Sequence, residues 1–275
     1  EITYKHILET TKALGVPLLQ LKSKKYPNGM VELAKVKKRF PASKSRYCTT
    51  ELKVIPFIDY LLDEVKDNVL IIQGIRANES EARSKMKDQC SLFKYYFVPY
   101  TNNFIKLEKV NKAIDKLRRA NKKVPISKLK EKETLTEKLI NGQVDNKFHT
   151  YRKADVKKFV KQYDDSIIRP FFEATGQDVI DYIYSKDQEP NELYEMGMSR
   201  VGCFPCVMAQ QNEVKQIAKR FPERINEIAK IEAKLNSTFF TTGKIPSYAC
   251  ANDKYPTILE VKDYVGRNGK ERFES

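Results

Sequence analysis

A short apolar run, Val69-Leu70-Ile71-Ile72-Gln73, restricts the fold of this chain more than any other segment. Uninterrupted aliphatic runs of this length are typical of strands buried in a parallel sheet. Apolar residues recur at helix-like spacing on both sides of the run, at residues 4–14 and 179–183. Residues 16–21 are expected to form a second short buried strand. The chain is therefore predicted to be an α/β protein with a parallel sheet.

Residues suited to binding oxyanions follow this strand directly. Gly74 and Arg76 fall at its carboxyl end, which is where ligands bind in open α/β sheets. Guanidinium groups match phosphate or sulfate bidentately, so Arg76 and Arg83 are candidate ligands for such a group. The alternative is a surface ion-pair cluster of these arginines with Glu79 and Glu81.

Two cysteines separated by two residues, Cys203 and Cys206, lie in a proline-containing segment. A tight turn there directs both sulfurs to one point, which suits a tetrahedral thiolate site, an iron–sulfur cluster or a redox dithiol. Arg200 and Gly202 flank the turn and favour a bound group, since glycine lets the backbone approach it. The alternative is a pair of buried thiols that pack as small hydrophobic side chains.

A third thiol lies beside positive charge. Cys48 is close in sequence to Arg46 and Lys53, and nearby cations lower the pKa of a thiol, which favours the thiolate that binds metals. The same segment could be an ordinary start of a helix that is capped by Thr49 or Thr50. The two interpretations are compatible.

Cysteine usage and charge indicate the compartment and the type of partner. Five cysteines at irregular separations argue against a secreted disulfide framework and favour metal binding. No apolar run approaches the roughly 20 residues of a membrane span, and the first residues lack signal-peptide character. We therefore expect a cytoplasmic protein with no membrane partner. The formal net charge of +15 is large enough to attract nucleic acid or nucleotide phosphates.

More than half of this excess charge lies in residues 101–165, which contain 18 basic and nine acidic side chains. Apolar residues recur there at helix-like spacing, which predicts helical hairpins inserted into the α/β domain. Such a face is often only solvated, but its concentration also suggests contact with DNA or tRNA. The recurring apolar residues are Val110, Ile114, Leu117, Leu129, Leu135, Leu139 and Ile140.

Four motifs follow one another along the chain: Arg46-x-Cys48-Thr49-x-x-Leu52-Lys53, Gly74-x-Arg76-x-x-Glu79-Ser80-x-x-Arg83, Arg169-Pro170 with Gln177-Asp178-Val179-x-x-Tyr182-Ile183, and Leu193-Tyr194-x-x-Gly197-x-Ser199-Arg200-x-Gly202-Cys203-x-x-Cys206. In this order they resemble the phosphoadenosine phosphosulfate reductase family, which belongs to the adenine-nucleotide alpha-hydrolase, or PP-loop ATP pyrophosphatase, superfamily. The resemblance covers roughly residues 1–100 and 166–210. The tail, with Phe239-Phe240 and a basic, glycine-containing end at 266–270, is most similar to the phage and mobile-element branch.

The resemblance implies a Rossmann-like parallel sheet, flanked by helices, that binds ATP, adenosine phosphosulfate or phosphoadenosine phosphosulfate. In cluster-containing relatives, cysteines at the positions of Cys48, Cys203 and Cys206 hold a [4Fe–4S] cluster, a type that normally has four thiolate ligands. The fourth ligand is then Cys250, with Cys90 as the alternative residue and zinc as the alternative metal. By position the resemblance assigns the nucleotide and phosphate contacts to Arg46, Lys53, Gly74, Arg76, Glu79, Ser80, Arg83 and Arg200. It assigns no catalytic residue.

Two parts of the family pattern are not found in the sequence. The first is the Ser-Gly-Gly-Lys-Asp-Ser phosphate loop with its strand, which belongs before the helix expected at residues 4–14. Either a preceding segment carries this loop, or pyrophosphate is not bound in the family's way. The second is the Glu-Cys-Gly-Leu-His segment that carries the nucleophilic cysteine of sulfonucleotide reductases.

Together these inferences predict a domain order and a function. The expected segments are an α/β nucleotide-binding part at 1–99, a basic helical insertion at 100–165, the rest of the α/β domain with the cysteine turn at 166–210, and a mostly helical C-terminal region at 211–275. We expect an enzyme that uses an adenine nucleotide in sulfur transfer or related activation, with a sulfur donor or thioredoxin-like partner. The alternatives are a sulfonucleotide reductase that releases sulfite and a non-enzymatic nucleic-acid-binding module with structural zinc.

Overall fold

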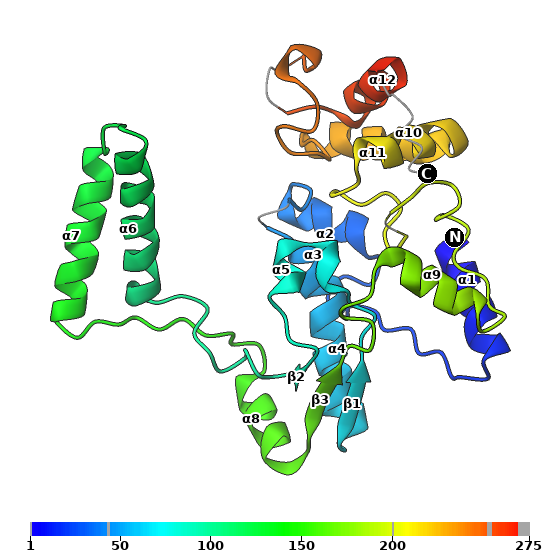
Figure 1. The fold of residues 1–275 in the computed structure, drawn as a ribbon, viewed down its shortest axis with the longest axis horizontal. Coiled ribbons are helices and arrows are strands. Elements are labelled where there is room, and N and C mark those ends of the chain that lie inside the picture. The colour runs from blue at the N-terminus through cyan, green and yellow to red at the C-terminus, as the bar shows by residue number, and fades with distance from the viewer. Residues whose placement is uncertain (1, 43–44, 200, 252–254, 269–275) are drawn as a thin grey trace. The chain divides into compact units, whose positions relative to one another are not determined.

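The computed structural model describes residues 2–42, 45–199, 201–251 and 255–268, and the chain divides into two compact units (Figure 1). The first unit combines Glu1–Glu64 with Thr175–Ser275, and the second is Val65–Ala174. The second unit is therefore inserted into the first along the chain. Cys203 and Cys206 belong to the first unit, and the basic helical insertion belongs to the second.

The second unit contains a three-stranded sheet with the order β1-β3-β2 (Figure 1). β1 (Val69–Ile72) pairs in parallel with β3 (Asp165–Ile168), and β2 (Gln89–Ser91) pairs antiparallel with β3. The Asp165 carboxylate accepts hydrogen bonds from Ser91 Oγ at 2.6 Å and from the Phe93 N–H at 2.7 Å, so it holds the end of β2 in place. The mixed α/β class and the parallel strand pair agree with the sequence prediction.

β1 forms where the sequence predicts it, but the strand is less buried than predicted. Leu70 and Ile72 are 62% and 67% exposed, whereas Val69 and Ile71 are partly buried. Successive residues of a strand face opposite sides of the sheet, and only one side of this short sheet is covered at β1. The prediction of a strand buried on both faces is therefore wrong.

Helices make up about half of the rest of the second unit. Its long helices α6 (Asn103–Arg119) and α7 (Ile126–Ile140) lie side by side as a hairpin (Figure 1). Val110 and Ile114 of α6 pack with Leu135 of α7 in a small buried cluster. The predicted helical insertion is thus confirmed. The remaining helical elements are η3 (Ala77–Glu79), α5 (Glu81–Ser84) and α8 (Lys153–Gln162).

The N-terminal part of the first unit is helical. α1 (Ile2–Ala13) and α2 (Met30–Lys37) are separate helices, and one continuous helical segment then runs to residue 65. Two stretches of this segment have wide π-helical turns, which often occur at functional sites. In chain order the segment consists of α3 (Tyr47–Thr49), η1 (Thr50–Val54), α4 (Ile55–Tyr60) and η2 (Leu61–Val65).

Residues 16–21 do not form the predicted buried strand. They are an extended segment without strand pairing, and all four of its large apolar side chains are exposed, with Leu19 at 57%. Gly15, with a φ of 64°, ends the preceding helix, and Pro17 lacks the N–H that a sheet partner would need. The apolar composition of the segment was therefore misleading, because no neighbouring strand pairs with it.

The C-terminal part of the first unit is mostly helical, as predicted. The Thr175 side chain and the Asp178 carboxylate form a capping box at the start of α9 (Gly176–Tyr184). One large apolar cluster joins α2 with the later helices, and Phe239 and Phe240 pack edge to face inside it at 5.0 Å. Among the described residues, no helix has both the length and the apolar character needed to cross a membrane. The later helices are α10 (Gln211–Arg220), α11 (Pro222–Leu235), η4 (Ser247–Ala249) and α12 (Ile258–Asn268).

Candidate functional site

The cysteine loop, residues 199–210, precedes α10 and carries the two closely spaced thiols. The Cys203 and Cys206 sulfurs are hydrogen-bonded to each other. Cys206 Sγ also accepts the Met208 N–H at 3.4 Å, and its carbonyl accepts the Ala209 N–H at 2.8 Å. Donors that point at a sulfur stabilise negative charge on it. The two thiols are therefore unequal: Cys206 accepts hydrogen bonds, and Cys203 lies beside it at the exposed side of the loop.

One buried carboxylate closes the cysteine loop. Glu213, in the first turn of α10, is 3% exposed. Its Oε1 accepts hydrogen bonds from the Ser199 N–H and Ser199 Oγ at 3.1 Å and 3.0 Å, and its Oε2 accepts the Gln210 N–H at 2.5 Å. Hydrogen bonds to an ionised acceptor are among the stronger ones in proteins. The two ends of the loop are thus fixed to one point at the start of a helix.

Apolar contacts support the loop from the side of the protein core. The Phe204 ring packs edge to face against Phe221, with centroids 4.9 Å apart, and Val201 and Val207 pack against the large apolar cluster. Cys250 belongs to this same cluster, is 5% exposed, and lies with Sγ 3.5 Å from the Pro246 carbonyl. The fourth predicted ligand is therefore a core residue beneath the loop.

The electrostatics of Cys203 connect the loop with residues near Cys48. The hydrogen bond with Cys206 raises the pKa of the Cys203 thiol most, and desolvation of its sulfur raises it further although the residue as a whole is exposed. The positive charge of Lys53 acts in the opposite direction, and Cys48 adds a small upward effect. Because such effects fade with distance, Cys48 and Lys53 lie near the cysteine pair. The net effect of these groups is to favour the protonated form of Cys203.

The surroundings of Cys48 are rich in cations. Desolvation raises the pKa of the neighbouring Tyr47 to about 12, even though the Arg39 charge opposes this. The Tyr47 hydroxyl donates to the Arg39 carbonyl, and Lys37 and Arg39 lie 5.9 Å and 5.6 Å from the centre of its ring. Lys37 pairs with Glu51 at 3.4 Å, whereas the Arg46 side chain is exposed. This neighbourhood attracts anions.

The described geometry does not in itself form a metal site. Within the part of the chain that the structure describes, no three His, Cys, Asp or Glu side chains are grouped closely enough to hold a metal ion. Cys48, Cys203 and Cys206 lie near one another, but their three sulfurs do not converge on one point. The ligand set Cys48, Cys203, Cys206 and Cys250 thus stays a prediction. Cys90 lies on β2 in the second unit.

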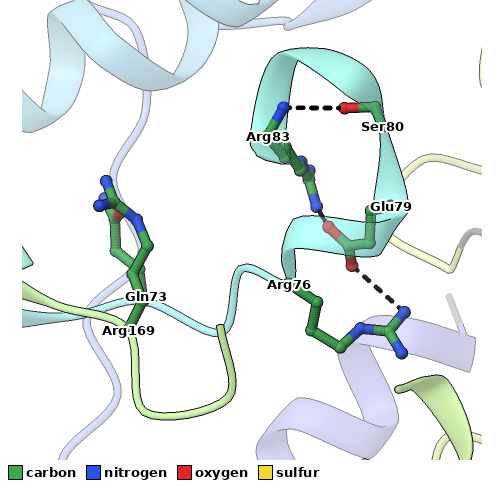
Figure 2. A network of polar contacts seen from close by, with 6 residues as sticks. All are labelled: Gln73, Arg76, Glu79, Ser80, Arg83 and Arg169. Atoms are coloured by element: carbon green, nitrogen blue, oxygen red, sulfur yellow. Dashed lines mark hydrogen bonds and ion pairs between the residues drawn. The ribbon is translucent and has the colours of Figure 1, made fainter. Parts of the chain in front are cut away.

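In the second unit, the residues after β1 form a polar network (Figure 2). The Glu79 carboxylate pairs with both Arg76, at 3.4 Å, and Arg83, and the Ser80 hydroxyl accepts the Arg83 N–H at 3.3 Å. The ion-pair cluster expected as the alternative is thus present around Glu79, while Glu81 pairs with Lys85 instead. Glu79 holds two guanidinium groups on neighbouring turns, which is also how a protein preorganises arginines for an oxyanion.

A buried arginine stabilises the end of the sheet beside this network. Arg169 is 8% exposed and follows β3. Arg169 lies beside Gln73 (Figure 2), and its Nε donates to Gln73 Oε1 at 3.1 Å. Its Nη1 donates to the Lys87 carbonyl and lies 3.6 Å from Cys90 Sγ. These bonds join the ends of all three strands. Arg169 and Cys90 therefore have structural partners within the second unit.

The predicted nucleotide contacts are distributed over both units. Arg46 and Lys53 belong to the first unit, and Arg200 lies outside the described residues, as do residues 269–270 of the basic tail. The predicted nucleotide contacts in the second unit are Gly74, Arg76, Glu79, Ser80 and Arg83.

Sequence reasoning missed Glu213. The usable signal was Gln210 followed three residues later by a glutamate, which is the pattern of a capping box at a helix start.

Comparisons with known proteins agree with the motifs. The family described as "Phosphoadenosine phosphosulfate reductase domain" matches residues 1–209. An uncharacterized 37.8 kDa protein of Escherichia phage 186 is 26% identical over 254 residues, which are 86% of this chain and 53% of that protein. An uncharacterized protein of Methanocaldococcus jannaschii is 37% identical over 60 residues, which are 22% of this chain and 15% of that protein.

The chain spans about half the length of the phage relative that it matches, and no solved structure shows a significant match. The family match covers both segments that carry the four motifs, including the cysteine loop up to Ala209. By this match the chain belongs to the phosphoadenosine phosphosulfate reductase family.

Proposed function

We propose that this protein uses an adenine nucleotide in sulfur transfer or related activation chemistry, with the cysteine loop as its reactive or metal-binding centre. Family membership supports an enzyme of the adenine-nucleotide alpha-hydrolase superfamily. The observation that carries the proposal is the thiol pair: a buried carboxylate holds its loop, and the positive charge of Lys53 opposes the rise in the pKa of Cys203. The five free cysteines also suit a reducing, cytoplasmic location.

The cations that the resemblance assigns to the nucleotide are proposed to bind its phosphate or sulfate groups. In such chemistry, positive groups aimed at the charge that develops on phosphorus or sulfur supply most of the catalytic help. Arg76 and Arg83, already held by Glu79, fit the phosphate or sulfate side, with Gly74 and Ser80 at the same turn. Arg46 and Lys53 are proposed to add charge near the thiols, and Arg200 stays a proposed nucleotide contact.

The thiols are proposed to hold a [4Fe–4S] cluster, with zinc as the alternative. Soft thiolates are the ligands that both types of centre prefer. Cys206 Sγ already accepts a backbone N–H, and donors of this kind tune bound metals. Binding would require Cys48 and the loop thiols to move together and to lose their protons, because the described residues do not converge on one point.

Metal analysis of anaerobically purified protein tests this centre. We expect several iron and sulfide ions per chain and a broad absorbance at about 400 nm, both of which are typical of this cluster type. Cys48→Ser, Cys203→Ser and Cys206→Ser should each lose most of the iron. Cys250→Ala and Cys90→Ser distinguish the two candidates for the fourth ligand, because only the variant that removes the true ligand should lose iron. About one zinc and no iron per chain would overturn the cluster and favour structural zinc.

A second candidate is the reduction of adenosine phosphosulfate or phosphoadenosine phosphosulfate, which the family description favours. A thioredoxin-like dithiol would supply the two electrons, and sulfite would leave. Incubation with each sulfonucleotide or with ATP separates the candidates: sulfite release supports reduction, and nucleotide cleavage with ATP supports activation. Absence of both, with no nucleotide bound in equilibrium dialysis, would contradict an enzymatic role and leave the non-enzymatic module.

A further inference from the structure

The α6–α7 hairpin is closed at its base by a buried side chain. Asn103 is 1% exposed, and its Nδ2 donates to the Gln143 carbonyl at 2.7 Å and to the Asp145 carboxylate at 3.0 Å. The Tyr100 N–H donates to the Lys147 carbonyl at 2.9 Å on the same side. These contacts join the two points where the hairpin leaves and re-enters the rest of the second unit. The opposite end of the hairpin is therefore its tip.

The hairpin has a core of its own that makes it a firm scaffold. Val110, Ile114 and Leu135 are buried between the helices, and Leu107 and Val124 pack against them. At 1.5 Å per residue, α6 is about 25 Å long, so the tip lies well away from the base. Charged side chains at the tip are thus carried on packed helices and a short turn.

The hairpin tip, residues 116–130, contains seven basic and no acidic side chains. All but Lys128 are exposed, and Lys128 is partly buried. None of the seven forms an ion pair with any residue that the structure describes. Other cations of the insertion do have partners: Lys112 pairs with Glu108 at 2.5 Å and Arg152 with Asp155 at 2.8 Å. The seven are Lys116, Arg118, Arg119, Lys122, Lys123, Lys128 and Lys130.

Local helix stability does not account for this arrangement. Cations at the C-terminal end of a helix are favoured by its dipole, which explains Lys116, Arg118 and Arg119 at the end of α6. Lys128, however, lies in the first turn of α7, where the dipole disfavours positive charge and where no acidic residue is present. Lys122 and Lys123 lie in the turn between the helices. Both helices therefore present like charge at one end, at a cost in self-repulsion.

We propose that the hairpin tip is a docking surface for the phosphate backbone of a nucleic acid. Packed helices have axes 8–10 Å apart, a general value, so the two rows of cations can contact several phosphates at once. Arg118 and Arg119 can bind phosphate oxygens bidentately. The tip has no Trp, Tyr or Phe, whereas protein hot spots and membrane-surface helices rely on such anchors. Binding is therefore sequence-independent and sensitive to salt.

This inference goes beyond the proposed function and does not depend on it, because the docking surface needs neither nucleotide nor metal. If both hold, the nucleic acid is the acceptor or substrate that the tip brings to the enzyme. A loss of docking would leave the metal and nucleotide tests unchanged, so the two proposals can fail separately.

Fluorescence anisotropy with a labelled 20-base-pair DNA duplex and with a single-stranded RNA of equal length tests the docking surface. The test variant is Lys116→Gln/Arg119→Gln/Lys122→Gln/Lys123→Gln in the full chain. The matched control, Lys12→Gln/Lys219→Gln/Lys230→Gln/Lys234→Gln, removes the same charge from exposed lysines of the first unit. Neither variant touches the hairpin core, and circular dichroism verifies the fold of both.

We expect the test variant to bind at least tenfold more weakly than the control at the same salt concentration. Each lost phosphate contact should also reduce the slope of log K against log salt by about 0.9 for the duplex, or about 0.7 for single strands. Equal weakening by both variants would overturn the proposal, since net charge alone would then explain binding. Absence of binding to either nucleic acid, with tip-dependent binding to anionic vesicles or to a poly-glutamate peptide, would also overturn it.

Discussion

At the scale of single residues, Glu213 determines the shape of the cysteine loop. Its carboxylate accepts three hydrogen bonds, from two points at opposite ends of the loop. The sulfurs themselves contribute little to holding the loop, because they bond mainly to each other and to the Met208 N–H. The position of the thiols therefore depends on a side chain that would not touch a substrate.

Glu213→Gln should loosen the loop without unfolding the unit. The amide retains one acceptor oxygen, so we expect a loss of about 1–3 kcal/mol in the free energy of unfolding. We also expect iodoacetamide to alkylate Cys203 several-fold faster at pH 8, because a weaker bond with Cys206 lowers the Cys203 pKa and raises the thiolate fraction. Peptide mass spectrometry measures this rate.

Glu232 provides the matched control for that experiment. It is likewise a buried carboxylate, 6% exposed, and it accepts the N–H groups of Phe239 at 2.6 Å and Ile258 at 3.0 Å. Glu232→Gln should lower stability by a similar amount and leave Cys203 alkylation unchanged. If both variants accelerate alkylation equally, Glu213 has no specific role in positioning the thiols.

At the scale of elements, the α6–α7 hairpin depends on a small core. Ile114 is 2% exposed between the helices, so Ile114→Ala should destabilise the hairpin by about 2–5 kcal/mol. Hydrogen exchange should become faster in α6 and α7 while β1 and β3 keep their protection. Ile126→Ala, at a side chain that is 67% exposed, is the control and should have little effect. Faster exchange throughout the second unit would contradict an independent hairpin core.

The sequence predicted the elements where apolar spacing and caps agree. The helices of the insertion and the helix around residues 179–183 depend on local features, since i, i+3 and i, i+4 contacts and caps lie within a few residues. Residues 16–21 failed because a strand also requires a partner, and pairing is a non-local property. For the same reason the sequence showed where β1 lies but not that Leu70 and Ile72 face outward.

At the scale of the whole molecule, part of the candidate functional site could be predicted, because its residues belong to recognisable sequence motifs. The cysteine pair and Cys48 were identified from sequence, and their role as metal ligands stays a prediction. The contacts of Arg76 with Glu79 were foreseen only as an alternative. The closing of the loop by Glu213 was not foreseen: its bond with Gln210 follows a local capping-box pattern, but its other partner, Ser199, precedes it by 14 residues. A side chain whose role is to accept hydrogen bonds from the backbone is difficult to recognise from a single sequence.

The alkaline pH dependence of stability also belongs to the whole chain. Burial raises the pKa of Tyr47 from 10.0 to about 12 and raises that of Tyr96, and Cys203 shifts in the same direction. Each group is held in its protonated form by folding, so its contribution is complete below its ordinary pKa. Stability should fall as the pH rises above about 9 and, for Tyr47, continue to fall between 10 and about 12. Urea unfolding at several pH values measures this.

Tyr47→Phe separates the tyrosine contribution from the rest. The variant should lose part of its stability at neutral pH, since the hydroxyl donates to the Arg39 carbonyl, and its stability should decline less steeply above pH 10. An unchanged slope would show that Tyr47 does not contribute to the alkaline loss.

The carboxylate that joins Ser199 to Gln210 has a further consequence for how such proteins can diverge. Glu213 joins both ends of the cysteine loop to the start of α10, and the sulfurs take no part in these bonds. The residues between Ser199 and Gln210 can therefore be substituted while the ends of the loop and the helix keep their positions. A descendant could lose Cys203 and Cys206, or acquire other side chains there, and still fold. The chemistry of this protein and the framework that carries it are thus separable by a few substitutions in one loop.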